Sequence, residues 1–326
     1  MNIAVFEVSR DERQELDLLG RTLPVTLHLF EKTLTLETAS LAEGSEGVSI
    51  LGHSVLDRPI LEELTRHGVK YLSTRTIGVD HIDVAAAREL GLRLSHAAYP
   101  PDAVADFTIM LMLLVLRHYK PAMWRQNVND YSLKGLMGRS LGRQTVGVVG
   151  TGSIGAAVIR ELSGFGCRIL AYNLVECEDL RPYATFVDLE TLYRECDIIT
   201  FHVPFTPETL HMVNRETLSL MKDGVILINT ARGELMDIDA VTAGVETEKI
   251  GSLAMDVFEH EQGIYHADRK TDILKNKDMV YLRQFPNVVL TQHMAFYTEE
   301  SIVSMVDCGI RSLLDMKEGR ATRLEL

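Results

Sequence analysis

Thr145-Val-Gly-Val-Val-Gly-Thr-Gly-Ser-Ile-Gly155 joins a short apolar run to a loop with glycines at Gly150, Gly152 and Gly155. The run has the continuous apolar character of a buried strand, and residues 156–165 continue in a helical pattern. Glycines at these three positions allow a tight turn, the close approach of a pyrophosphate to backbone N–H groups, and close packing of the helix on the strand. The stretch therefore predicts a strand–loop–helix unit that binds a dinucleotide.

Strand-length apolar runs alternate with helical patterns along most of the chain. These runs are residues 3–8, 47–51, 71–74, 145–149, 168–172, 198–202, 225–229, 252–257 and 288–291. Continuous apolar strands that alternate with helices indicate parallel sheets covered on both faces. The sequence thus predicts an α/β fold with two Rossmann-like, doubly wound parallel-sheet domains, for which 326 residues are sufficient.

A boundary between the two domains is predicted near residue 100. Two prolines in Ala98-Tyr-Pro-Pro-Asp102 interrupt any strand or helix, and a long apolar helix is expected over residues 103–117. A helical pattern at residues 299–317 is too short to make a domain, so we expect it to pack back onto the first one. The predicted domains are a discontinuous substrate-binding domain closed by the C-terminal helix, residues 1–101 plus 295–326, and a dinucleotide-binding domain, residues 102–294.

Net charge and apolar patterning argue against several classes of protein. With 33 Lys and Arg against 46 Asp and Glu, the chain has a net charge of -13 and no basic patch, which disfavours nucleic acid or a membrane surface as a partner. The most apolar stretch, Thr108 to Leu116, is about half the ~18 residues needed to cross a bilayer. No apolar signal segment follows the N-terminus, so we expect a cytoplasmic protein.

Neither cysteines nor histidines show the spacing of a metal site. The four cysteines are scattered without C-x-x-C spacing, as expected for free thiols in a reducing compartment. His81, His96, His260 and His266 have no paired spacing with cysteines or carboxylates. We therefore expect no metal ion.

Asn173 stands at the end of the second strand of the dinucleotide unit, where an acidic side chain usually accepts hydrogen bonds from the adenosine ribose. Asn can still bind the ribose of NAD(H), but it removes a negative charge that would repel a 2′-phosphate. No Arg or Lys occurs in residues 174–179 to pair with such a phosphate. We therefore predict NAD(H) as the cofactor, with tolerance of NADP(H).

Three charged or titratable residues, Arg232, Glu261 and His293, follow the ends of predicted strands. Ligands bind at the carboxyl ends of strands in doubly wound sheets, so the three can converge on one crevice. Hydride transfer to a 2-keto acid requires a cation for the substrate carboxylate, a proton donor for the carbonyl oxygen, and a group that keeps this donor protonated. Taken singly, these residues fit a surface ion pair, a solvated carboxylate and a structural histidine. Together they favour catalysis.

Ordered motifs extend from the glycine loop almost to the C-terminus. They are Gly150-x-Gly152-x-x-Gly155, His202-Val-Pro204 with Thr209, Asn229-Thr-Ala-Arg-Gly233, Asp256-Val-Phe-Glu259-x-Glu261, and Gln292-His293 with Tyr297-Thr-Glu. Together they resemble the D-isomer-specific 2-hydroxyacid dehydrogenases, and Arg75-Thr-Ile-Gly78-Val-Asp80 is similar to that family's substrate-carboxylate loop. Gly52-His53, Tyr99-Pro-Pro-Asp102 and the aromatic run after His293 make the likeness closest to the D-lactate dehydrogenases.

The resemblance implies roles for the matching residues. Arg232 would bind and orient the substrate carboxylate, His293 would be the acid/base, and Glu261 would pair with His293 and keep it protonated. Substrate contacts are implied for Gly78, Val79, His53, Tyr99 and Phe296. Cofactor contacts are implied for Gly150, Gly152, Ser153, Ile154, Gly155, Asn173, Val203, Pro204, Thr209, Thr230, Ala231 and Asp256. His202 is interpreted as a structural residue beside the cofactor loop.

The activity implied is the reversible NAD(P)H-dependent reduction of pyruvate and similar small 2-keto acids to D-2-hydroxy acids, in a homodimer. Lactate-specific members often carry two tyrosines after the catalytic histidine, whereas this chain has Ala295-Phe296-Tyr297. A broader pocket is consistent with the alternative of a D-2-hydroxyisocaproate or phenyllactate dehydrogenase. An alternative of another class, a non-enzymatic NAD(H)-sensing corepressor, shares the fold and the histidine–carboxylate pair, but the sequence shows no appended interaction segment.

Overall fold

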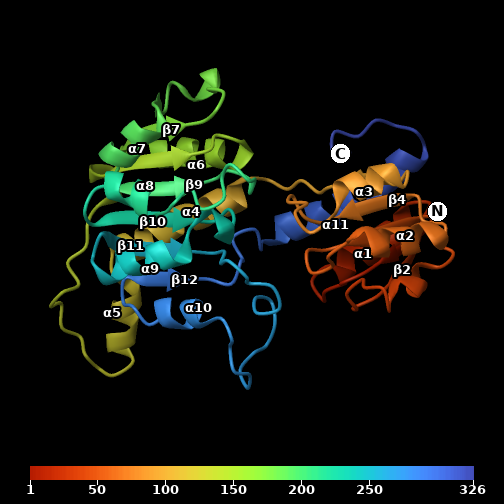
Figure 1. The fold of residues 1–326 in the computed structure, drawn as a ribbon, viewed down its shortest axis with the longest axis horizontal. Coiled ribbons are helices and arrows are strands. Elements are labelled where there is room, and N and C mark those ends of the chain that lie inside the picture. The colour runs from red at the N-terminus through yellow and green to blue at the C-terminus, as the bar shows by residue number, and fades with distance from the viewer. The chain divides into compact units, whose positions relative to one another are not determined.

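The computed structural model describes residues Met1 to Leu326 and contains two compact units (Figure 1). Unit 1 consists of Met1–Pro100 and Tyr297–Leu326, and unit 2 consists of Pro101–Phe296. Pro101, Ala295 and Phe296, expected in the first domain, are therefore part of unit 2. For Ala295 and Phe296 the reason is local, because the two residues before Phe296 bind the Asp256 carboxylate through their N–H groups, and its ring contacts that of His293.

Unit 1 has a five-stranded parallel sheet in the order β2-β1-β3-β4-β5. Its strands are β1 (Asn2–Val5), β2 (Thr26–Leu29), β3 (Gly47–Ile50), β4 (Tyr71–Thr74) and β5 (Arg93–Ser95). Its helices are α1 (Arg13–Thr22), α2 (Arg58–Arg66), α3 (Val84–Glu89) and α11 (Glu299–Lys317), with a 3-10 turn at Ala39–Ala42.

Alternate residues of β1 show how both faces of this sheet are covered. Ile3 and Val5 pack with α1 and α11, whereas Ala4 and Phe6 pack with α2 and α3. Because side chains alternate across a strand, a continuous apolar run buries one set on each face. The C-terminal helix α11 therefore completes one layer of unit 1, as the sequence predicts.

Unit 2 has a seven-stranded parallel sheet in the order β12-β11-β10-β9-β6-β7-β8. Its strands are β6 (Thr145–Val149), β7 (Arg168–Tyr172), β8 (Thr185–Phe186), β9 (Ile198–Phe201), β10 (Val225–Asn229), β11 (Ile250–Met255) and β12 (Val288–Leu290). Its helices are α4 (Asp102–Leu116), α5 (Tyr119–Gln126), α6 (Ser153–Ser163), α7 (Leu189–Glu195), α8 (Arg215–Leu220), α9 (Ile238–Glu246) and α10 (Lys277–Leu282). Short 3-10 turns lie at Leu141–Arg143, Glu178–Leu180 and Gly233–Leu235.

Helices also cover both faces of the unit 2 sheet. One apolar cluster joins the sheet to α4 and α6, and the other joins it to α7, α8 and α9. The chain direction across the sheet reverses between β6 and β9, which are neighbours although two strands separate them in sequence. In doubly wound folds ligands bind at such a switch point, outside the carboxyl ends of the strands.

The predicted fold class is confirmed, and the strands missed by the sequence prediction share a physical cause. β2 and β5 are the two edge strands of the unit 1 sheet, and β8 is an edge strand of the unit 2 sheet. None of the three has a continuous apolar run. An edge strand is covered less completely, so its sequence needs fewer apolar residues. Thr26-Leu-His-Leu29, for example, alternates between exposed and half-buried positions.

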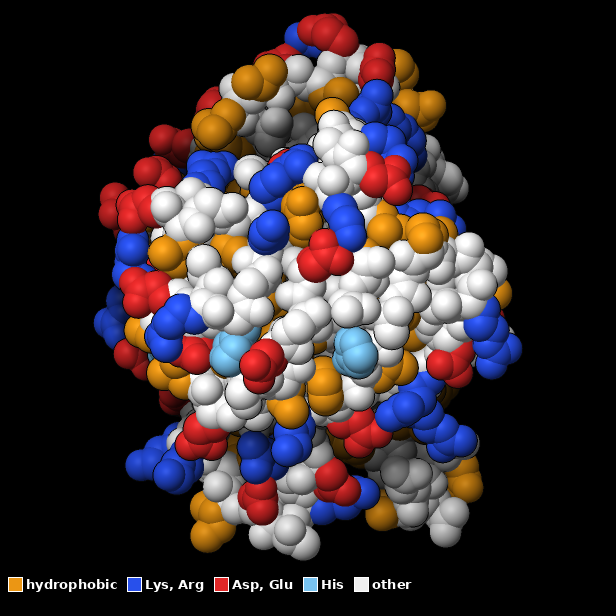
Figure 2. All heavy atoms as spheres, turned by 90° about the vertical axis from the view of Figure 1, so that its right-hand side faces the viewer, with side chains coloured by type: hydrophobic (Ala, Val, Ile, Leu, Met, Phe, Trp, Pro, Cys, Tyr) orange, Lys and Arg blue, Asp and Glu red, His pale blue; other side chains and the backbone are white.

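No helix is both long and apolar enough to cross a bilayer. On the face of the molecule shown in Figure 2, basic and acidic side chains are interspersed. All four cysteines are free thiols.

Glu161 on α6 makes the stability of unit 2 depend on pH. Burial, together with Asp106 and Asp102 of α4, raises the pKa of Glu161 to about 7. The folded state therefore binds this proton more tightly than the unfolded state does. Stability should fall as pH rises from about 4.5 to 7, and the penalty, about 1–3 kcal/mol, should be fully present above pH 7.

We therefore expect Glu161→Gln to raise the thermal midpoint of unfolding by a few degrees at pH 8 and to leave it unchanged at pH 5, where Glu161 is already protonated. Scanning calorimetry of both proteins at the two pH values measures this difference. Equal shifts at both pH values would contradict the explanation.

Candidate active site

The glycine loop lies between β6 and α6 as expected. Gly150 has a φ of +92°, and a Cβ there would lie 2.6 Å from the carbonyl oxygen of His202. A Cβ on Gly155 would lie 2.0 Å from the Gly150 carbonyl oxygen, so the helix and the loop touch backbone to backbone. A Cβ on Gly152 would meet nothing, so the space beside the first turn of α6 is open. These features fit a pyrophosphate at the N-terminus of α6, between the loop and Ser153 and Ile154.

Asn173 follows β7 and is tied to the glycine loop. Its Oδ1 accepts the N–H of Thr151 at 3.3 Å, and its Nδ2 donates to the Val175 carbonyl at 2.8 Å. The amide therefore fixes the loop in addition to any ribose contact. The nearest downstream cation, Arg181, already pairs with Glu176 and Glu178.

The segment after β9 is held by short-range hydrogen bonds. His202 lies 2.9 Å from the Thr200 hydroxyl, and burial lowers the pKa of His202 to about 3, so its ring is neutral. Thr209 donates its hydroxyl proton to the Pro204 carbonyl at 2.8 Å, which closes the loop that begins at Val203. Val203 and Thr209 are half-buried, whereas Pro204 is exposed.

The loop after β10 presents Arg232. Asn229, fully buried at the end of the strand, accepts the Ala231 N–H at 3.0 Å and donates to the Arg232 carbonyl at 2.8 Å. The hydroxyl of Thr230 lies 2.9 Å from that of Thr108 on α4. Asn229 is a positioning residue that the site prediction left out, although a polar residue at the end of an apolar strand is a readable signal.

The loop after β11 carries Asp256 and Glu261. Asp256 is fully buried, and its carboxylate accepts the Thr291 hydroxyl at 2.5 Å and the N–H groups of Met294 and Ala295 at 3.0 and 2.7 Å. Asp256 therefore fixes the turn that follows β12, and the cofactor contact expected for it stays a prediction.

His293 lies in that turn and contacts Glu261. The His293 Nδ1 and the Glu261 Oε1 form a short hydrogen bond, and the Glu261 Oε2 accepts the Phe258 N–H at 2.6 Å. Since a carboxylate only accepts, Nδ1 carries the proton and Nε2 is the nitrogen that can exchange a proton with a ligand. The His293 side chain is 31% exposed, so a ligand can reach it.

We call Arg232, Glu261 and His293 the candidate trio. They follow β10, β11 and β12, three neighbouring strands of one sheet. The Arg232 loop also touches the Glu261 loop, because a Cβ on Gly233 would lie 2.2 Å from the Glu259 nitrogen. The trio thus combines a guanidinium with a carboxylate-bound imidazole at the carboxyl ends of three neighbouring strands.

The substrate-contact residues expected in unit 1 lie on loops at the ends of strands. The N–H groups of Gly78 and Val79, after β4, donate to no protein acceptor, whereas the Gly78 carbonyl accepts the Thr76 hydroxyl at 2.7 Å. Arg75 in the same motif is fully buried and donates to Glu12 at 2.6 Å, so it anchors the loop. His53 is exposed and Tyr99 half-buried.

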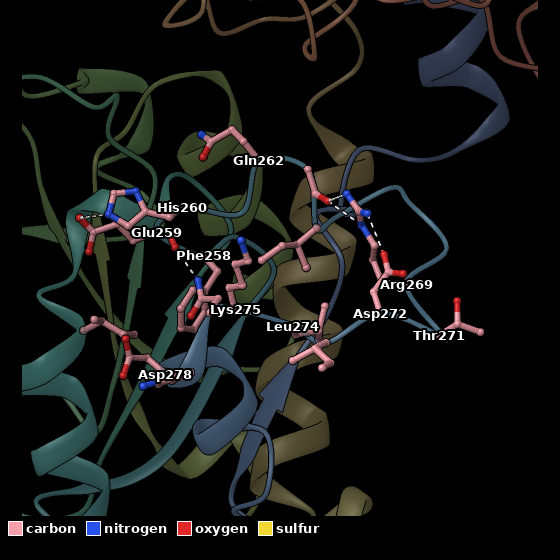
Figure 3. Close-up of a pocket in the computed structure, with 16 residues that line it drawn as sticks. Phe258, Glu259, His260, Gln262, Arg269, Thr271, Asp272, Leu274, Lys275 and Asp278 are labelled. Atoms are coloured by element: carbon pink, nitrogen blue, oxygen red, sulfur yellow. Dashed lines mark hydrogen bonds and ion pairs between the residues drawn. The ribbon is translucent and has the colours of Figure 1, made fainter.

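A large open pocket of about 1020 Å³ lies in unit 2 beside the loop between β11 and α10 (Figure 3). None of the candidate trio lines it, although residues on both sides of Glu261 do. Arg269 braces this loop by donating to the Gly263 carbonyl at 2.8 Å and to Asp272 at 2.8 Å. The loop therefore has two sides. Glu261 is directed at His293, whereas the residues before and after Glu261 line the pocket.

Comparison with known proteins gives consistent results for the whole chain. A family profile described as the D-isomer specific 2-hydroxyacid dehydrogenase NAD binding domain matches residues 109–295. An aromatic 2-oxoacid reductase from Clostridium sporogenes is 38% identical over 319 residues, 97% of this chain and 96% of that protein. A D-lactate dehydrogenase from Escherichia coli is 37% identical over 328 residues, 100% of both chains. The solved structure of a D-2-hydroxyisocaproate dehydrogenase aligns with a TM-score of 0.91 at 32% identity, covering 100% of this chain and 99% of that one.

Proposed function

Because this chain belongs to the D-isomer-specific 2-hydroxyacid dehydrogenase family, we propose that it is a D-lactate dehydrogenase that reversibly reduces pyruvate and similar small 2-keto acids to D-2-hydroxy acids. The family membership makes it an NAD-dependent oxidoreductase that acts on a CH-OH group, and favours an enzyme over a corepressor. NADH, when bound, supplies the hydride. The observation that carries the proposal is the hydrogen bond of His293 to Glu261 beside the loop of Arg232.

The candidate trio divides the remaining work of keto-acid reduction. Arg232 binds the substrate carboxylate, for which a planar guanidinium can offer two parallel hydrogen bonds. His293 gives its Nε2 proton to the carbonyl oxygen as that oxygen gains negative charge, and takes it back in the reverse direction. Glu261 stabilises the imidazolium through Nδ1 and fixes the ring orientation.

The remaining site residues provide binding surfaces. In unit 1, we assign the N–H groups of Gly78 and Val79 to the substrate carboxylate, and His53 and Tyr99 to the substrate side chain. In unit 2, Phe296 contacts the His293 ring and is assigned to the same side chain. The cofactor is assigned to the open side of the glycine loop, with Asn173, Val203, Pro204, Thr209, Thr230, Ala231 and Asp256 around it.

Initial rates of NADH oxidation with pyruvate, 2-ketobutyrate, 2-ketoisocaproate and phenylpyruvate test the substrate proposal. Pyruvate should give the highest kcat/KM. A decisive preference for phenylpyruvate or 2-ketoisocaproate would instead establish the second candidate, a phenyllactate or D-2-hydroxyisocaproate dehydrogenase. The similarity to an aromatic 2-oxoacid reductase and the phenylalanine at position 296 favour this second candidate.

Use of NADP(H) alongside NAD(H) is proposed from Asn173, which places no negative charge at the end of β7. Asn173→Asp should lower kcat/KM for NADPH by about tenfold or more while changing that for NADH by less than about threefold, because a carboxylate repels the 2′-phosphate. Steady-state kinetics with both cofactors measure the ratio. Rejection of NADPH by the unmodified protein would contradict the proposed tolerance.

A homodimer is proposed from the exposed face of α4. Along this face lie Asp102, Asp106, Met110, Leu113 and Arg117. These five residues form a stripe that is acidic at its start, apolar in the middle and basic at its end. A groove of about 700 Å³ follows it, and most of its lining is apolar. In a second copy packed antiparallel about a two-fold axis at Met110, the basic end of one stripe meets the acidic end of the other. The stripe is thus complementary to itself.

Met110→Asp should convert the protein from a dimer to a monomer, because it places a like-charged pair at the two-fold axis. Light scattering after size exclusion should give about twice 36.5 kDa for the unmodified protein and about 36.5 kDa for the variant. Ile273→Asp, at a position 94% exposed on the loop before α10, is the control and should stay dimeric. A dimeric Met110→Asp variant would contradict this interface.

A further inference from the structure

The turn that carries His293 has an unfavourable backbone conformation that must be held in place. His293 has a φ of +51°, in the left-handed region that L-residues other than glycine seldom adopt. The His293 N–H donates to the Asp256 carbonyl at 2.7 Å, which ties the turn to the end of β11. The Asp256 carboxylate binds the next two N–H groups. These bonds fix the N–H groups of the turn and leave the His293 carbonyl to another partner.

That partner is His266, which reaches back from the loop between β11 and α10. The His266 Nε2 lies 2.9 Å from the His293 carbonyl oxygen, and because a carbonyl only accepts, Nε2 donates. The two rings are 6.0 Å apart between centroids, and the His266 ring lies 6.3 Å from that of Phe296. His293 and Phe296 are themselves 6.2 Å apart with nearly perpendicular rings. The three rings therefore form one cluster.

The loop that carries His266 also carries Glu261 and is braced internally. Arg269 links the Gly263 carbonyl to Asp272, and Asn276 donates to the Glu259 carbonyl at 3.2 Å (Figure 3). One braced loop thus holds His293 at two points: Glu261 at the ring nitrogen Nδ1 and His266 at the main-chain carbonyl. Two points of attachment define the direction of the ring more closely than one does.

We propose that His266 is a positioning residue for His293, and that its hydrogen bond to the His293 carbonyl, beyond the packing of its ring, keeps the His293 Nε2 directed at the reacting oxygen. The inference rests on the proposed role of His293 as acid/base. A donor at this position preserves the function, whereas an aromatic ring without a donor does not.

Two variants separate hydrogen bonding from packing. His266→Phe keeps a ring but removes the donor, and His266→Gln keeps a donor but removes the ring. We expect His266→Phe to lower kcat for pyruvate about tenfold with little change in KM for NADH, and His266→Gln to stay within about threefold of the unmodified protein. His260→Phe is the control, because His260 lies on the same loop as His266, is also exposed, and has the same φ of 60° as His266.

A second readout does not depend on turnover. In protein labelled with 15N at histidine, the His293 ring resonances, identified by their loss in His293→Asn, should shift in His266→Phe and remain in place in His266→Gln. A protein inactive toward every 2-keto acid would remove the proposed function, while these spectra would still test the hydrogen bond. Full activity in His266→Phe, or equal losses and equal shifts in both variants, would overturn the proposal.

Discussion

Replacing Arg232 by Lys is expected to lower kcat/KM for pyruvate by about 100- to 1000-fold. Lysine keeps the positive charge but offers a single point of attachment, whereas guanidinium binds a carboxylate through two parallel hydrogen bonds. Losing this geometry weakens binding and also misplaces the carbonyl relative to His293, so both KM and kcat should change. Steady-state kinetics over a range of pyruvate concentrations measure the two effects separately.

Folding is not expected to suffer in this variant, because the loop is fixed by Asn229 through main-chain groups. NADH binding, followed by the fluorescence of the bound nicotinamide, should remain within about threefold of the unmodified protein, since the change is aimed at the substrate carboxylate. A loss of less than about fivefold in kcat/KM would remove Arg232 from its proposed role.

Replacing Glu261 by Gln is expected to lower kcat for pyruvate reduction by about ten- to a hundredfold. The carboxylate makes a charge-assisted hydrogen bond to the His293 Nδ1–H and holds the ring in place, whereas a neutral amide makes a weaker bond and holds the ring less firmly. The Nε2 proton is then delivered less well to the carbonyl oxygen, while binding of the substrate carboxylate by Arg232 is preserved. Steady-state kinetics should therefore show a loss in kcat with little change in KM for pyruvate.

Glu259→Gln is the matched control for this experiment. Glu259 is two residues away and faces the large pocket, where it lies 3.5 Å from His211 instead of contacting His293. Its replacement should leave kcat for pyruvate reduction within about twofold of the unmodified protein. An equally small change in Glu261→Gln would show that this carboxylate does not position His293.

The fold was predictable where the burial of a strand makes its sequence continuously apolar. Strands in the middle of each sheet, such as β6 and β10, are apolar at almost every position because helices cover both of their faces. Their bounds match the expected runs. Edge strands such as β2 have no continuous apolar run, because one side of the strand has no neighbour and exposed polar residues are tolerated.

Site residues could be predicted where their chemical type and their place after a strand suggest a role. They could not be predicted where the contact depends on how a loop folds. Arg232, Glu261 and His293 follow three strands, and parallel topology places such residues at one edge. The inward direction of Asp256 and the contact of His266 with His293 depend on how the connecting loop folds back over 27 residues, and no periodicity records that path. His266 therefore looked unremarkable in sequence.

The most direct test of the account is the fate of a deuterium label. NADH that carries deuterium at both hydrogen positions of the reactive carbon is incubated with pyruvate and the protein, and the product is analysed by chiral chromatography and mass spectrometry. We expect D-lactate with one deuterium at C2 and negligible L-lactate. Formation of L-lactate would contradict D-specific reduction, and D-lactate without the label would contradict direct hydride transfer. No lactate at all would contradict the assignment of pyruvate as substrate.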